Sequence, residues 1–240
     1  MPSLPTNFLR DMCAYCGSRD NLDSDHVPPK NLFLKPRPTN IITVPACPVC
    51  HSGTSKDDEY FRLKLCLRSN ASEHPKAKAI WNSIFRSLNR KEATGLRSSF
   101  LSDIRRVRLH TQAGLYIGST LAHDVDVNRI RRVVERTVRG LYFAESCNPL
   151  GLSNEVSIYT NEDISADKLD ELNQTILTPL AAVAPKVIGD NVFLYRFHIE
   201  NENPVYSVWG LSFYAKVPFL CFTGPHRVPL LGSVVSSRSS

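Results

Sequence analysis

Two pairs of cysteines constrain the fold of this chain more than any other feature of its sequence. The first pair forms C-A-Y-C at Cys13 and Cys16, and the second forms C-P-V-C at Cys47 and Cys50, with 30 residues between the pairs. In a reducing compartment, two C-x2-C pairs are typical of four thiolates around one tetrahedral zinc ion. Gly17 supplies the trailing glycine of a zinc knuckle. We therefore expect a structural zinc site, with two disulfides in a secreted protein as the alternative.

The composition is that of an ordinary globular protein, and 240 residues suffice for one large domain or two small ones. No segment approaches ~20 consecutive apolar residues, so no membrane span is expected. The first residues lack the basic start and apolar core of a secretory signal, which favours a cytoplasmic location. The polar composition of residues 233–240 predicts a disordered tail.

Charge is unevenly distributed along the chain. Residues 1–140 hold 23 Lys and Arg against 13 Asp and Glu, whereas residues 141–240 hold 6 against 10. A basic front half favours a polyanionic partner such as nucleic acid, because bound phosphates release counterions. A solvated basic surface is the alternative. Five arginines of this half lie on one predicted helix, and we expect most of them to form a stripe that faces solvent or phosphate: Arg129, Arg131, Arg132, Arg136 and Arg139.

The periodicity of apolar residues predicts an α+β fold in two parts, an N-terminal module over residues 1–70 and an accessory domain over residues 71–232. The expected accessory elements are helices over about 75–92, 127–145 and 166–180, and strands over about 105–120, 156–160 and 191–223. The strands over about 191–223 are expected to form an antiparallel sheet. The range 105–120 is expected to be a hairpin that turns at Ala113-Gly114.

The segment between the cysteine pairs contains two short strand signals, D-S-D-H-V and T-N-I-I-T-V. A helix is expected to begin near Gly53, directly after the second pair. The order of knuckle, two strands, knuckle and helix predicts a treble-clef-like module. Such a module would bring His26, Asn40 and His51 close together.

Residues from about 11 to 70 resemble the HNH endonucleases, which are ββα-metal nucleases. The resemblance rests on four features in chain order: C-A-Y-C, D-H-V-P-P, Asn40 and C-P-V-C-H. The resemblance implies metal-dependent hydrolysis of DNA, with RNA as a substrate not excluded. It implies that Asp25 and His51 hold one catalytic Mg²⁺ or Mn²⁺ ion. A neutral imidazole suits His26 to act as the general base that activates water. Asn40 would then orient the base or brace the loop.

The sequence departs from the family pattern in the long loop K-N-L-F-L-K-P-R-P that follows the first strand. Asn31 is therefore an alternative to Asn40 for the middle position, and His51 stands where asparagine is common. Contacts to phosphate are predicted for four basic residues, each of which is alternatively a surface charge: Lys30, Lys35, Arg37 and Lys56. Three acids follow the second cysteine pair: Asp57, Asp58 and Glu59. They are either acids in the first turn of a helix or further ligands of the metal site.

A second class of function stays open from the sequence, a non-catalytic zinc module that binds nucleic acid or protein. The size of the chain resembles that of HNH enzymes in bacterial restriction or phage defence. The acidic back half is not expected to be the main DNA clamp. It instead suits an oligomer contact or a partner protein.

Overall fold

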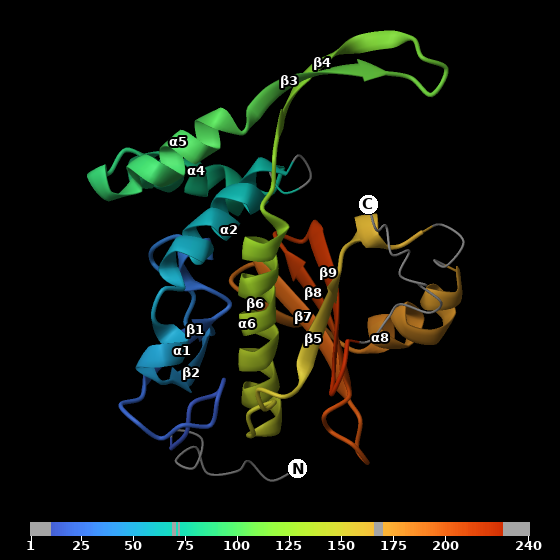
Figure 1. The fold of residues 1–240 in the computed structure, drawn as a ribbon. Helices are drawn as coiled ribbons and strands as arrows, with labels where there is room; N and C mark the ends of the chain where they lie inside the picture. The colour runs from blue at the N-terminus through green and yellow to red at the C-terminus, as the bar shows by residue number, and fades with distance from the viewer. Residues whose placement is uncertain (1–10, 69–70, 72, 166–169, 228–240) are drawn as a thin grey trace, which may run out of the picture.

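Antiparallel strand pairing organises this mixed α/β protein, of which a computed structural model describes residues 11–68, 71, 73–165 and 170–227 (Figure 1). The strands of these residues form two two-stranded sheets and one five-stranded sheet. The α+β class predicted from the sequence is confirmed at this level.

The first sheet joins β1 (Asp23–Val27) to β2 (Ile42–Ala46), with Asp25 opposite Val44. The predicted first strand is confirmed, but the second begins at Ile42, so Asn40 lies in the preceding loop. That loop also contains the 3₁₀ helix η2 (Lys30–Leu32). The structure differs from the prediction after the second cysteine pair, because a separate short helix α1 (Pro48–His51) precedes α2 (Ser55–Leu67).

Two helices and a hairpin follow: α4 (Pro75–Leu88), α5 (Thr94–Ser102), β3 (Ile104–His110) and β4 (Tyr116–His123). A 3₁₀ turn, η3 (Lys91–Ala93), separates the helices. The predicted hairpin is confirmed. Its turn is closed by the N–H of Gly114, which donates to the carbonyl of Thr111 at 2.9 Å. Gly114 has a φ of +83°, a left-handed conformation that glycine adopts without steric cost.

The longest helix is α6 (Val127–Ser146), which matches the helix predicted over 127–145. Asp126 caps it, because its carboxylate accepts from the backbone N–H groups of Asn128 and Arg129 at 3.0 and 3.3 Å. The helix ends at Cys147, which has a left-handed φ of 63°.

The five-stranded sheet has the order β5-β9-β8-β7-β6 and is antiparallel throughout. Its strands are β5 (Glu155–Tyr159), β6 (Lys186–Ile188), β7 (Phe193–Ile199), β8 (Ser207–Phe213) and β9 (Val217–Gly224). The sequence did not predict β6, which is too short to show a period. A 3₁₀ turn η4 (Asn161–Asp163) follows β5.

The helix predicted over 166–180 is only partly comparable with the structure, because residues 166–169 lie outside the described residues. Further along, a π-helical segment η5 (Asn173–Leu177) leads directly into the short helix α8 (Thr178–Ala182). The predicted tail over residues 233–240 also lies outside the described residues.

One hydrophobic core fills the space between the large sheet, α6 and the N-terminal segment. Alternate residues of β8 point into it, including Trp209, Leu211 and Phe213. Cys13 and Phe61 belong to the same core, so both predicted parts of the chain pack on it. A smaller cluster covers the opposite face of the sheet beneath α8 and η5. Figure 1 shows α6 across one face and α8 on the other.

None of the helices in the described ranges combines the length and apolarity needed to cross a lipid bilayer. All seven cysteines are described and none is in a disulfide. Cys66 and Cys221 are buried, whereas Cys147 is half-buried.

Candidate metal centre

The four paired cysteines converge to one point at the N-terminal end of the molecule. Their sulfur atoms all lie within 4.8 Å of one another, and the sulfurs of Cys16 and Cys47 are 3.6 Å apart. A tetrahedral zinc ion with Zn–S bonds of about 2.3 Å separates its sulfurs by about 3.8 Å. The arrangement therefore fits a metal ion such as zinc.

Backbone geometry supports this interpretation of both knuckles. The N–H of Gly17 donates to the carbonyl of Cys13 at 2.9 Å, and Gly17 has a φ of +77°. The backbone N–H of Cys50 lowers the pKa of the Cys47 thiol to about 7, whereas burial raises the pKa of Cys50, so without a metal the surroundings favour the thiolate at Cys47 and not at Cys50. The N–H of Ala14 donates to the carbonyl of Pro45 at 2.8 Å and joins the first knuckle to β2.

Asp25 is held in a fixed orientation although it is almost fully buried, with 5% of its surface exposed. Tyr15 lies between Cys13 and Cys16 in the sequence, and its hydroxyl donates to Asp25 Oδ2 at 2.6 Å. Arg136 Nε on α6 lies 3.8 Å from the same oxygen. Burial and the adjacent Asp25 raise the pKa of Tyr15, so the hydroxyl stays a donor. One carboxylate oxygen is therefore engaged by protein groups on two sides.

The other oxygen of Asp25, Oδ1, accepts from the backbone N–H of His26 at 2.9 Å and faces His51, whose Nδ1 atom lies 3.5 Å away. This nitrogen is buried and has no hydrogen-bond partner among the residues that the structure describes, whereas the His51 side chain as a whole is 41% exposed. Thr54 Oγ1 donates to the His51 carbonyl at 3.1 Å and fixes the end of α1. A buried nitrogen beside a carboxylate oxygen offers two atoms of the kinds that bind divalent cations, and the role of these two residues as metal ligands stays a prediction.

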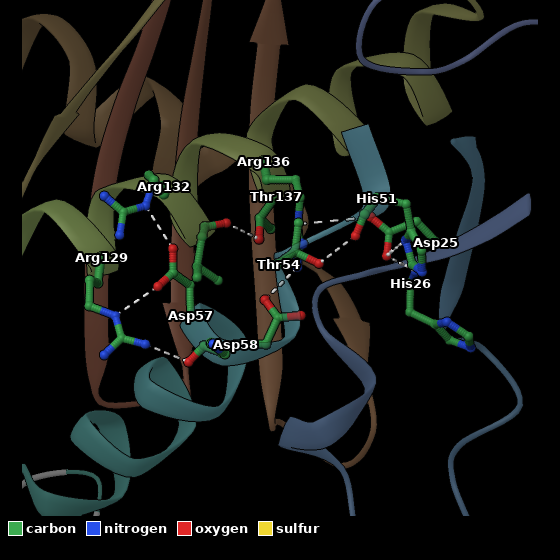
Figure 2. A network of polar contacts seen from close by, with 12 residues as sticks. Asp25, His26, His51, Thr54, Asp57, Asp58, Arg129, Arg132, Arg136 and Thr137 are labelled. Carbon is green, nitrogen blue, oxygen red and sulfur yellow. Dashed lines mark hydrogen bonds and ion pairs between the residues drawn. The ribbon is translucent and has the colours of Figure 1, made fainter. Parts of the chain in front are cut away.

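His26 is the neighbour of Asp25 on β1, so the two side chains leave the strand on opposite faces. Figure 2 shows the His26 ring directed away from the Asp25–His51 pair. Burial lowers the pKa of His26 below its usual value, and the positive charges of Lys30 and Arg37 lower it further. His26 is therefore neutral and able to accept a proton near neutral pH.

Asn40 does not contact His26 through any hydrogen bond within the described part of the chain. Its side-chain amide instead donates to the carbonyl of Val187 in β6 at 2.8 Å. The contact braces the loop before β2 against the large sheet, which is one of the two roles that the resemblance implies. In the same loop, Asn31 has a buried Oδ1 atom without a hydrogen-bond partner.

All four predicted phosphate-binding residues are exposed, and three of them, Lys30, Lys35 and Arg37, lie in the loop after β1. Arg37 Nε donates to the Lys30 carbonyl at 3.3 Å. Lys35 lines a pocket of about 670 Å³ between this loop and β6, together with Lys76 of α4. Lys56 is exposed in the first turn of α2. Across the described ranges, none of the four predicted residues forms an ion pair.

The first-turn acids of α2 pair with arginines of α6 (Figure 2). Asp57 accepts from Nε of Arg129 and of Arg132, both at 2.7 Å. Burial opposes ionisation of Asp57, but the hydrogen bonds from the two arginines outweigh it and lower its pKa. The predicted solvated or phosphate-facing stripe is therefore wrong for the largely covered Arg129, which an acid of the neighbouring helix neutralises, whereas Arg132 is paired but still 58% exposed. Arg131 forms no ion pair within the described ranges.

One further pair joins the two helices, and two more each lie within a single helix. Asp58 accepts from Arg136 at 2.5 Å, and Glu59 lies 3.6 Å from Arg62. Arg139 donates to Glu135 at 2.9 Å. All three predicted first-turn acids thus face cationic side chains.

Two residues that hold Asp25 were not recognised as part of the site from the sequence. Tyr15 is one of two residues inside a knuckle, and no spacing rule links it to position 25. Arg136 was identified only as one of a row of arginines 111 residues away from Asp25. Comparison of the chain with protein-family models, with curated proteins and with solved structures found no match.

Proposed function

We propose that this protein is a metal-dependent endonuclease of the HNH type, which hydrolyses phosphodiester bonds of DNA on a treble-clef frame. The observation that carries the proposal is the approach of Asp25 Oδ1 to the unpartnered Nδ1 of His51 at 3.5 Å, beside the four-cysteine cluster. A purely structural zinc finger needs the cysteines and no such pair.

The zinc ion has a structural role in this proposal. Four thiolates complete a zinc coordination shell and leave no open position for substrate. Tyr15 connects the zinc site to the reaction, because its place in the first knuckle determines where its hydroxyl holds Asp25 Oδ2. Loss of the zinc would therefore also release Asp25.

Asp25 and His51 would hold the catalytic divalent ion. A carboxylate oxygen suits Mg²⁺ and Mn²⁺, and an imidazole nitrogen suits transition metals, so this mixed pair favours Mn²⁺ over Mg²⁺. When bound, the ion supplies Lewis-acid stabilisation of the phosphate and the leaving oxygen. The Tyr15 and Arg136 contacts occupy Oδ2, whereas Oδ1 accepts one hydrogen bond, from the backbone N–H of His26, and would use its second lone pair for this task.

His26 would take the proton from the attacking water. In an in-line displacement the attacking and leaving oxygens lie on opposite sides of phosphorus, so the base need not contact the metal ligands. This requirement agrees with a His26 ring directed away from Asp25 and His51 (Figure 2). Lys30 and Arg37, whose charges act on His26, would contact the phosphate.

The test is plasmid cleavage in the presence of Mg²⁺ or Mn²⁺, compared with the same reaction without either ion. His26→Ala is expected to lower the rate about 10²–10⁴-fold, the usual contribution of a general base. His198→Ala, an exposed histidine on β7, is the matched control and should retain the wild-type rate.

Equal cleavage by wild type and His26→Ala would overturn the catalytic assignment. Absence of cleavage on duplex DNA, single-stranded DNA and RNA would overturn the enzyme itself. The protein would then be a zinc module without hydrolytic activity.

A further inference from the structure

The hairpin of β3 and β4 projects away from the rest of the molecule as a narrow arm (Figure 1). Its strands pair from Ile104 opposite His123 to His110 opposite Tyr116. Seven or eight residues at about 3.3 Å each give an arm of about 25 Å. An isolated two-stranded hairpin is only marginally stable in water, so a partner that covers it would stabilise it.

The arm is a cationic surface without compensating acids. From Ile104 to His123 the sequence contains three arginines and no Asp or Glu. The larger segment of residues 75–123, which includes α4, α5 and the arm, holds nine Lys and Arg against two Asp and Glu. Its balance of +7 exceeds the net charge of +6 of the whole chain.

Two of the three arginines lie on the same face of the arm, because alternate residues of a strand share a face. These are Arg106 and Arg108, which are exposed and stand opposite Leu121 and Ser119. Neither forms an ion pair with any residue that the structure describes. Arg105, on the other face, pairs with Asp124 at 3.0 Å and closes the base of the arm.

The tip of the arm is apolar and exposed. Leu115 and Ile117 are 68% and 61% exposed. Tyr116 is positioned on the arginine face by its hydroxyl contact with Ser119 at 2.9 Å and by the ring of His110, at a centroid distance of 5.7 Å. Cations along a ribbon that ends in aliphatic side chains are the combination that proteins insert into DNA grooves.

We propose that the β3–β4 arm binds in a groove of duplex DNA, with Arg106 and Arg108 on phosphates and Leu115 and Ile117 toward the base edges. The choice of DNA as the polyanion rests on the proposed function. The major groove, about 12 Å wide, admits a two-stranded β-ribbon. A second copy of this chain fits the face less well, because paired arms would place uncompensated arginines opposite one another.

The first experiment measures equilibrium binding of the full-length protein to a labelled 30-base-pair duplex at several salt concentrations, with no Mg²⁺ or Mn²⁺ added. Each phosphate contact contributes about 0.9 to the slope of log K against log salt concentration. R106Q combined with R108Q should reduce that slope by about 1.8 and weaken binding at least about tenfold at 0.1 M salt. The matched control, K216Q combined with R227Q, removes the same charge from exposed positions outside the arm and should bind as the wild type.

The second experiment separates DNA binding from self-association. Residues 106–121 are replaced by the two-residue turn Asn-Gly, which closes the strands at the Arg105–Ala122 pair. We expect an unchanged molar mass in analytical ultracentrifugation and the same loss of DNA affinity. A fall in molar mass, with DNA affinity retained, would overturn the proposal and assign the arm to a second copy.

An unchanged affinity and salt slope in R106Q with R108Q would also overturn it, whether or not the protein cleaves DNA. Loss of affinity in a protein that cuts no nucleic acid would support the arm and reject only the proposed nuclease. The two proposals therefore fail separately.

Discussion

Arginines in two regions of this molecule have opposite surroundings, although both rows are equally basic in the sequence. On α6, Arg129, Arg132 and Arg136 are paired with Asp57 and Asp58 of α2. On the β3–β4 arm, Arg106 and Arg108 are exposed and face no acid among the described residues. The first row fastens the N-terminal module to the central helix, whereas the second is free to bind a partner.

The difference shows that the chemistry of a basic residue depends on the acids that the fold brings to it. Arg136 also approaches Asp25 of the candidate metal centre at 3.8 Å, so the α2–α6 contact reaches the proposed catalytic residues. A charge count over a segment cannot separate these cases. Substitutions in the two regions should therefore have different effects on stability and binding.

Substitution of the cysteines that are predicted to bind zinc should cause the largest loss of stability in the N-terminal module, the region in which the arginines of α6 are paired. Structural zinc contributes about 10–16 kcal/mol to folding in small zinc modules, which is comparable to the total stability of a domain. Cys47→Ser with Cys50→Ser should lose about one zinc per chain and the folded structure of the module. Metal analysis and circular dichroism measure both, and Cys147→Ser is the control. Retention of zinc by the double variant would show that other ligands hold it.

Arg136→Gln should be the next most severe change. It leaves the buried carboxylates of Asp25 and Asp58 without a cation, and breaking a buried ion pair on one side costs about 3–5 kcal/mol. Arg106→Gln should change stability by less than about 0.5 kcal/mol, because the side chain is exposed and unpaired. Urea unfolding measures both. Equal losses in the two variants would contradict the distinction between the regions.

Gly140→Ala tests how closely α6 approaches β1. A Cβ atom at this position would lie 2.5 Å from Cγ2 of the buried Val27 and 3.4 Å from the Tyr15 hydroxyl. Overpacking costs about 1–3 kcal/mol, more than the approximately 1 kcal/mol that alanine gains in a helix. The variant should therefore be less stable in thermal unfolding. Gly95→Ala in α5, where nothing lies within 4 Å, should be neutral or stabilising.

Asp57→Asn should show the smallest loss among the changes to the paired α2–α6 contact, with a defined dependence on pH. Because the folded-state pKa of Asp57 lies below its usual value of 3.8, its stabilisation is complete above pH 3.8 and is lost as pH falls through the folded value. We expect a loss of about 1–2 kcal/mol at pH 7 that disappears well below pH 3.8. Urea titrations at both pH values measure it. A loss that is independent of pH would show that the carboxylate charge does not contribute.

Local patterns in the sequence were sufficient for many elements. The spacing of cysteines predicted a cluster that the structure brings within 4.8 Å, and alternation around Ala113-Gly114 predicted the hairpin. The apolar period predicted α6. Each of these signals depends on residues close in sequence or on one chemical rule, so no knowledge of the packing was required.

Other features required residues that are distant in the sequence. Asn40 was expected near His26, but its amide reaches Val187, 147 residues away, on a strand too short to predict. The arginine row of α6 was expected to face solvent or phosphate, because the sequence does not reveal that α2 packs beside it. The three-residue strand β6 shows no periodicity of its own and is defined by its pairing with β7.

The sequence by itself determined the cysteine cluster, the order of residues that resembles a nuclease site and the basic character of the front half. Only the tertiary structure decided that Tyr15 and Arg136 hold one oxygen of Asp25 while the other faces His51. It also decided which arginines are neutralised and which stay free on the arm. The physical reason is that charge pairing and desolvation depend on distances of a few ångströms between segments, which chain order does not specify.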